Sequence, residues 1–218
     1  MIELAPDLFQ LTLPPRNAVN VYLMGDVLVD SGLGLYGKRI LSQLEGRAVS
    51  AHTLTHCHPD HIGSTNLVCD TRDIPLWCGE RDVPAMESGD QTMQKPPSTR
   101  WLDKLGKQPA HPVARALKEG DDAGGFTVLD APGHTPGHIA YWRESDRALI
   151  LGDVVMAMNP FIMKKGLREP FRPFTPDPAQ NRDSARKLAA LNPELICFGH
   201  GAPCRDPEAF QRFVASLD

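Results

Sequence analysis

The stretch that decides the fold is Thr55-His56-Cys57-His58-Pro59-Asp60-His61. It follows a short apolar run and places three imidazoles and one carboxylate within six residues. His56 and His58 are two residues apart, so both side chains point to the same side of an extended segment. Asp60 and His61 come after Pro59, which favours the first turn of a helix, so they can face a second ion. The stretch predicts a metal site at the end of a strand.

Three later segments repeat this arrangement, each with a ligand-type residue shortly after a predicted apolar strand. They are His134 after residues 126–129, Asp153 after residues 148–151 and His200 after residues 194–198. Side chains at strand ends are held by a rigid scaffold and can reach a common rim. Imidazole and carboxylate groups bind zinc, iron or manganese, and seven of them exceed the four ligands of one tetrahedral ion. The spacing therefore favours two metal ions.

Composition narrows the class of protein. The 218 residues permit one large domain or two small ones, and 23 Lys+Arg against 27 Asp+Glu give a net charge of −4. Without a basic stripe we expect no nucleic-acid partner, and without an apolar run of roughly 20 residues we expect no membrane partner. The first residues lack a secretory pattern and the five cysteines cannot all pair. We therefore expect a cytoplasmic protein with reduced thiols.

The hydrophobic pattern predicts short strands and helices in both halves of the chain. Strands are expected at residues 8–13, 20–24, 27–30, 51–55, 74–78, 126–129, 139–142, 148–151 and 194–198. Helices are expected at residues 36–44, 62–69, 80–87, 178–191 and 207–217, with a short one around Trp101. The segment 154–177 carries four prolines and is expected to be a long loop. Strand meanders followed by helices indicate a layered α/β or α+β architecture.

The ordered set His56-x-His58-x-Asp60-His61, His134, Asp153 and His200 resembles the metallo-β-lactamase-fold hydrolase superfamily. The resemblance covers nearly the whole chain and includes the Asp30-Ser31-Gly32 turn. It implies a four-layer αββα sandwich. Both halves, roughly 1–110 and 111–218, supply ligands, so we expect one domain over residues 1–218 with two pseudo-symmetric halves.

The resemblance also implies an assignment of ligands. His56, His58 and His134 would hold one metal, Asp60, His61 and His200 would hold the second, and Asp153 would bridge them. We expect two divalent ions, zinc by default, with iron or manganese as alternatives. A water between two metals becomes hydroxide near neutral pH, and Asp60 is the expected catalytic residue that orients it and carries a proton to the leaving group.

The expected activity is hydrolysis of an ester, thioester or lactone of a small molecule. The chain departs from glyoxalase II-like enzymes because only 18 residues follow His200, and from lactonase-like enzymes because Met156 stands where they carry tyrosine. Asp153 differs from the Cys or Ser of true β-lactamases of this fold. The branch is therefore unresolved. A mononuclear-iron persulfide dioxygenase-like enzyme, a β-lactamase-like amide hydrolase and a non-catalytic metal-binding protein are the alternatives.

Residues around the expected ligands receive supporting roles. Histidine ligands usually donate their second N–H to a neighbouring group, and the candidates for this role are Asp30, Thr55, Thr135 and His138. The segment 154–177 combines apolar and cationic residues that could cover a substrate with an acyl chain and an acidic group. Its candidate substrate-binding residues are Met156, Phe161, Lys164, Lys165, Arg168 and Phe171. The alternative for this segment is a contact in a homodimer.

Overall fold

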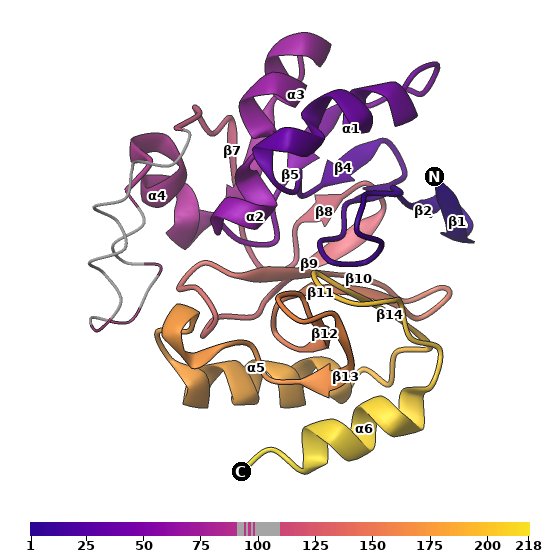
Figure 1. Cartoon of the computed structure of the whole chain (residues 1–218), viewed down its shortest axis with the longest axis vertical. Helices are drawn as coiled ribbons and strands as arrows, with labels where there is room; N and C mark the ends of the chain where they lie inside the picture. Colours follow the sequence, from indigo (N-terminus) through magenta and orange to yellow (C-terminus); the bar gives the residue numbers. More distant parts are fainter. Residues whose placement is uncertain (91–93, 95, 97, 99–109) are drawn as a thin grey trace.

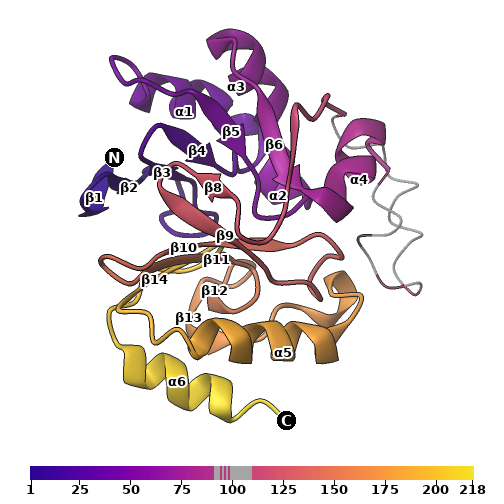
Figure 2. The same cartoon turned by 180° about the vertical axis from the view of Figure 1, so that it is seen from behind.

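In the computed structural model, residues 1–90, 94, 96, 98 and 110–218 are described. Two sheets face each other in the centre of the molecule, with helices outside each of them (Figure 1). Helices α1, α2, α3 and α4 lie on the side of the first sheet, and α5 and α6 lie on the side of the second (Figures 1 and 2). The expected four-layer αββα sandwich is confirmed.

The first sheet has the strand order β1-β2-β3-β4-β5-β6-β7. Its strands are β1 (Ile2–Ala5), β2 (Leu8–Gln10), β3 (Tyr22–Met24), β4 (Val27–Val29), β5 (Ala51–Thr53), β6 (Leu76–Gly79) and β7 (Arg115–Leu117). The helices beside it are α1 (Gly37–Gln43), α2 (Pro59–Ile62), α3 (Thr65–Arg72) and α4 (Val83–Ser88). Strands β4, β5, β6 and β7 are parallel, so their carboxyl ends meet at one edge of the sheet.

The second sheet has the strand order β14-β11-β10-β9-β8. Its strands are β8 (Asp122–Ala123), β9 (Phe126–Asp130), β10 (Ile139–Arg143), β11 (Ala148–Gly152) and β14 (Leu195–Phe198). Helices α5 (Pro178–Ala189) and α6 (Pro207–Ala215) cover it. Strands β11 and β14 are parallel, so the chain leaves both at the same edge.

Strand periodicity explains how the second sheet fills two layers of core. Along β10 and β11, Tyr141 and Ile150 pack between the two sheets, whereas Ala140 and Leu149 pack against α5 and α6. Successive side chains of a strand point to opposite faces, so one strand supplies both layers. Full burial of each large apolar side chain contributes roughly 1.5–3 kcal/mol.

Several predicted elements are confirmed with shorter bounds. The predicted strand 51–55 ends at Thr53, because the backbone N–H of Thr55 donates to Asp30 Oδ1 at 2.7 Å instead of extending the ladder. The predicted helix after Asp177 is present, and the Asp177 side chain accepts from the N–H of Gln180. Strands β1, β7 and β8 were not predicted. The helix predicted around Trp101 lies outside the described residues.

The expectation of a long loop over residues 154–177 is wrong. Strands β12 (Met156–Asn159) and β13 (Lys164–Arg168) pair there as an antiparallel hairpin, followed by the 3-10 helix η5 (Arg172–Phe174). None of the four prolines lies within β12 or β13, so they did not prevent strand pairing. Within the described ranges, no helix is both long and apolar enough to cross a membrane.

Candidate metal centre

Four loops at one edge of the two sheets bring the seven predicted ligands together. His56 and His58 follow β5, and α2 begins directly after His58 and carries Asp60 and His61. The other three lie between β9 and β10, after β11 and after β14. Their candidate ligand atoms form three groups, each within 4.8 Å: His56, His58 and His134; His56, His61 and Asp153; and Asp60, His61 and His200.

The first group consists of three buried imidazoles. His58 Nδ1 lies 3.0 Å from His134 Nε2, and the His56 ring lies 4.7 and 4.8 Å from the His58 and His134 rings, measured between centroids. Burial lowers the pKa of all three histidines, and the neighbouring imidazoles lower those of His56 and His134 further. They are therefore neutral near pH 7, which is the form that binds a metal.

The third group, formed by Asp60, His61 and His200, pairs imidazoles with carboxylates. His200 Nε2 lies 3.2 Å from Asp60 Oδ2 and 3.1 Å from Asp153 Oδ2. Burial opposes a charge on His200, but these carboxylates outweigh it and raise the pKa of His200 to about 10. Asp153 also lies 3.7 Å from His61 and 3.6 Å from His134, so its carboxylate stands between the third group and the first.

The non-ligand nitrogen of every one of the five histidines contacts an acceptor. The Thr55 hydroxyl donates its hydrogen to Asp30, and the Thr175 hydroxyl donates its own to the Phe171 carbonyl. Each hydroxyl oxygen can therefore only accept from its histidine, so His56 Nδ1 donates to Thr55 and His134 Nδ1 donates to Thr175, both at 3.1 Å. His61 Nδ1 donates to Asp30 at 2.8 Å. The remaining two donate to backbone carbonyls, His58 Nε2 to Gln94 and His200 Nδ1 to Ala18. These contacts occupy one nitrogen of each ring and leave the other directed into the cluster, where it can bind a metal in its unprotonated form.

Buried polar atoms without partners fit the same interpretation. His56 Nε2, His61 Nε2 and Asp153 Oδ1 are buried and have no hydrogen-bond partner among the described residues. Leaving such atoms unpaired is costly unless something else coordinates them. The backbone also approaches closely, since a Cβ on Gly199 would meet Asp153 Oδ1 at 2.0 Å. The donor set of imidazole nitrogens and carboxylate oxygens fits two divalent metal ions.

The predicted supporting residues occupy different places. Asp30 contacts His61 and Thr55, and Thr55 contacts His56. His138 Nε2 accepts the backbone N–H of Asp153 at 3.1 Å. Thr135 contacts none of the predicted ligands through its side chain, but donates to Asp82 at 3.0 Å.

Asp82 is a residue of the site that the sequence analysis missed. It lies in the 3-10 helix η2 (Glu80–Asp82), and its carboxylate is fully buried. Four donors surround it: Cys57 N–H at 3.2 Å, Gly137 N–H at 2.8 Å, Thr135 Oγ1 at 3.0 Å and Gln94 Nε2 at 3.1 Å. One carboxylate thus links the loop of His56 and His58, the loop after His134 and the residue whose carbonyl holds His58. Because its sequence neighbours Glu80 and Arg81 are charged, the sequence pattern indicated an exposed helix face at this position.

A cavity of about 510 Å³ opens onto the metal cluster and touches His58, Asp60, His134, Asp153 and His200. Of the predicted substrate-binding residues, Met156, Phe161 and Phe171 line it. Lys164, Lys165 and Arg168 are not among the described residues that line it. The two lysines are exposed on β13, and the Arg168 guanidinium lies 5.2 Å from the centroid of the Phe171 ring.

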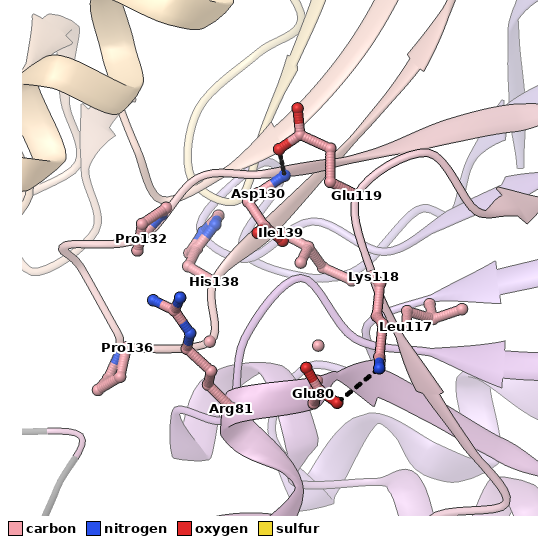
Figure 3. A pocket seen from close by; sticks show the side chains of 12 residues that line it. Glu80, Arg81, Leu117, Lys118, Glu119, Asp130, Pro132, Pro136, His138 and Ile139 are labelled. Carbon is pink, nitrogen blue, oxygen red and sulfur yellow. Dashed lines mark hydrogen bonds and ion pairs between the residues drawn. The ribbon is translucent and has the colours of Figure 1, made fainter.

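A second, smaller cavity of about 270 Å³ has a different character. Charged side chains line it, among them Lys118, which pairs with Glu80 at 2.9 Å, and Glu119, which accepts from the Asp130 N–H (Figure 3). Its lining includes His138 but none of the seven candidate ligands. The larger cavity is therefore the one where a substrate can reach the cluster.

Comparison with known proteins agrees with this geometry. Residues 14–200 match the family model described as the metallo-beta-lactamase superfamily. "Probable metallo-hydrolase YflN" of Bacillus subtilis (strain 168) is 29% identical, covering 92% of this chain and 86% of that protein. A hydroxyacylglutathione hydrolase of Bdellovibrio bacteriovorus is 27% identical over 69% of this chain and 48% of its own length. The crystal structure of TTHA1623 in a di-iron-bound form is 29% identical, with a TM-score of 0.71 over 94% of this chain and 97% of that one.

Proposed function

The chain belongs to the metallo-β-lactamase superfamily, and from that premise we propose that it is a two-metal hydrolase of an ester, thioester or lactone. One observation carries the proposal: five buried histidines each have one nitrogen engaged by an acceptor and the other directed into a cluster shared with Asp60 and Asp153. A purely structural histidine cluster has no need to leave the buried His56 Nε2 and His61 Nε2 without a partner. A single-ion site would use only one of the groups.

The candidate ligands divide into two sets, one for each proposed ion. His56, His58 and His134 would hold one ion, Asp60, His61 and His200 the other, and Asp153 lies between them. The two ions, when bound, supply a nucleophilic water at neutral pH and polarise the substrate carbonyl. We assign zinc, with iron or manganese as alternatives; the di-iron form of the structural relative supports iron as one alternative.

Asp60 is the proposed catalytic residue. Its side chain is about one-third exposed and lines the large cavity, where it meets the substrate. Burial would raise the pKa of Asp60, but His61 and His200 lower it below the usual range. The ionised carboxylate can accept a proton from the attacking water at Oδ2 and pass it to the departing oxygen or sulfur.

The cavity favours an ester-type bond over an amide. An amine leaves only after protonation, whereas an alkoxide or thiolate needs less assistance. Apart from the metal-site residues, the one hydroxyl on the cavity wall is that of Tyr36, and it donates to the Pro14 carbonyl at 2.7 Å. Among the described residues that line the cavity, no second acid is thus free to protonate an amine.

The test is hydrolysis of ester, thioester, lactone, β-lactam and persulfide substrates by the metal-loaded protein and its Asp60→Asn variant. We expect turnover of at least one ester-type substrate, falling by 10²–10⁴-fold in the variant. Asp183→Asn, an exposed carboxylate on α5, is the matched control and should keep wild-type activity. Full activity in Asp60→Asn, or turnover of β-lactam or persulfide alone, contradicts the proposal.

A further inference from the structure

Among the described residues, the large cavity has an apolar lining except at the metal cluster. Sixteen of these residues line it; five are candidate ligands, and the other eleven are apolar or aromatic. The sole polar atom on those eleven side chains, the Tyr36 hydroxyl, is already engaged by Pro14. Within the described residues, the wall therefore offers a substrate no charge and no free hydrogen-bonding side chain beyond the cluster itself.

Three segments far apart in the sequence form this wall. Residues 15–19 and 33–36 contribute the small and aliphatic side chains of Pro15, Ala18, Val19 and Leu33 and the aromatic ring of Tyr36. The β12–β13 hairpin and the segment after it contribute Met156, Phe161, Phe171 and Phe174. The Phe161 and Phe171 rings contact each other with centroids 5.1 Å apart and tilted planes. An aromatic edge thus extends the apolar wall outward from the metal site.

The cations of the same hairpin lie elsewhere. Lys164 and Lys165 are exposed on β13 and do not line the cavity. Arg168 also does not line the cavity, and its guanidinium lies over the Phe171 ring. A charged substrate tail on this wall would lose its hydration without gaining a partner. The arrangement selects against the acidic or zwitterionic tail that these cations would otherwise suit.

From this wall we propose that the substrate is an ester, thioester or lactone whose larger group is an uncharged alkyl chain or aryl ring. This rests on the proposed hydrolase function and deepens it. The carbonyl lies at the metal cluster and the apolar group lies along Met156, Phe161 and Phe171. Water adds to the acyl carbon, the bond from that carbon to oxygen or sulfur breaks, and the leaving group takes a proton. The products are a carboxylic acid and an alcohol or thiol, joined in one molecule for a lactone.

A series of p-nitrophenyl esters with the metal-loaded protein tests the inference. From acetate to octanoate, kcat/KM should rise by about fourfold per methylene until the chain fills the cavity. The hemisuccinate, which carries a terminal carboxylate, should be hydrolysed more slowly than the butyrate. Phe171→Ser should flatten the dependence on chain length. Lys164→Ala and Lys165→Ala should leave it unchanged, since both side chains are exposed outside the cavity.

Failure of the inference can be separated from failure of the function. Ester hydrolysis with no gain from longer chains, or with preference for the hemisuccinate, overturns the apolar substrate and leaves the hydrolase intact. Calorimetric titration with 1-octanol and with succinate needs no turnover. Binding of octanol, weakened in Phe171→Ser, supports the apolar wall even if no ester is cleaved. Binding of succinate alone overturns it.

Discussion

Replacing Asp82 with asparagine removes a buried charge while keeping the size of the side chain. All four partners of Asp82 are donors, and asparagine offers one acceptor oxygen and one amide that donates. The least costly orientation keeps Gly137 and Gln94 on the oxygen and lets the Thr135 hydroxyl rotate to accept. The Cys57 N–H then faces the side-chain NH₂ group of the asparagine, which is also a donor. With one buried donor unsatisfied and charge-assisted bonds weakened, the free energy of unfolding should fall by about 2–4 kcal/mol.

The functional effect should be confined to one metal site. Asp82 supports the loop of His56 and His58 and, through Gln94, the orientation of the His58 ring. Loss of such a supporting contact typically weakens metal affinity by about 10–100-fold. In competition titrations against a chelator, Asp82→Asn should weaken one of two binding steps by this amount. The step assigned to Asp60, His61 and His200 should stay near wild type.

Leu188→Ala is the control for general destabilisation. Leu188 is buried in α5, and its side chain forms no hydrogen bond to the metal-binding loops. Its truncation should lower the free energy of unfolding by about 2–5 kcal/mol. It should lower stability without changing either metal affinity. If Asp82→Asn leaves both affinities unchanged, as Leu188→Ala should, or weakens both equally, then Asp82 does not position the first site.

Two further predictions concern other buried groups. Burial lowers the pKa of His52 to about 4, and its ring contacts Leu28 and Thr65. The unfolded chain therefore binds more protons between pH 6.5 and 4, so about 3 kcal/mol of stability should be lost as pH falls through that window. Urea unfolding of metal-free His52→Gln should show a loss smaller by that amount; an identical pH dependence would refute it. In Gly199→Ala, the new methyl would meet Asp153 Oδ1 at 2.0 Å, so we expect loss of bound metal by elemental analysis, and two retained ions would contradict the close approach.

The sequence could predict which seven candidate ligands the structure brings together, and the reason is physical. Metal ligands must be specific residue types, and their positions after apolar strands could be read from local patterns such as the run before His56. The acceptors that orient them are different. His58 and His200 donate to backbone carbonyls of Gln94 and Ala18, and every residue carries a carbonyl, so no pattern marks these two.

The β12–β13 hairpin shows a second limit. The four prolines of residues 154–177 suggested a loop, yet Met156 and Met158 are buried on β12, which pairs with β13. Their alternation could be seen in the sequence, but no local pattern shows that Met156 lines the same cavity as the distant Leu33. Lys164 and Lys165 were predicted as substrate contacts from their neighbours in sequence, which do not show that both lie outside the described lining of the cavity.

Metal titration of chelator-stripped protein, with ester hydrolysis followed at each addition, tests the central claim most directly. The donor set around Asp153 predicts no hydrolysis in the stripped protein and a maximum at two equivalents of divalent metal per chain. Full hydrolysis without metal, or a maximum at a single equivalent, would contradict a two-metal hydrolase.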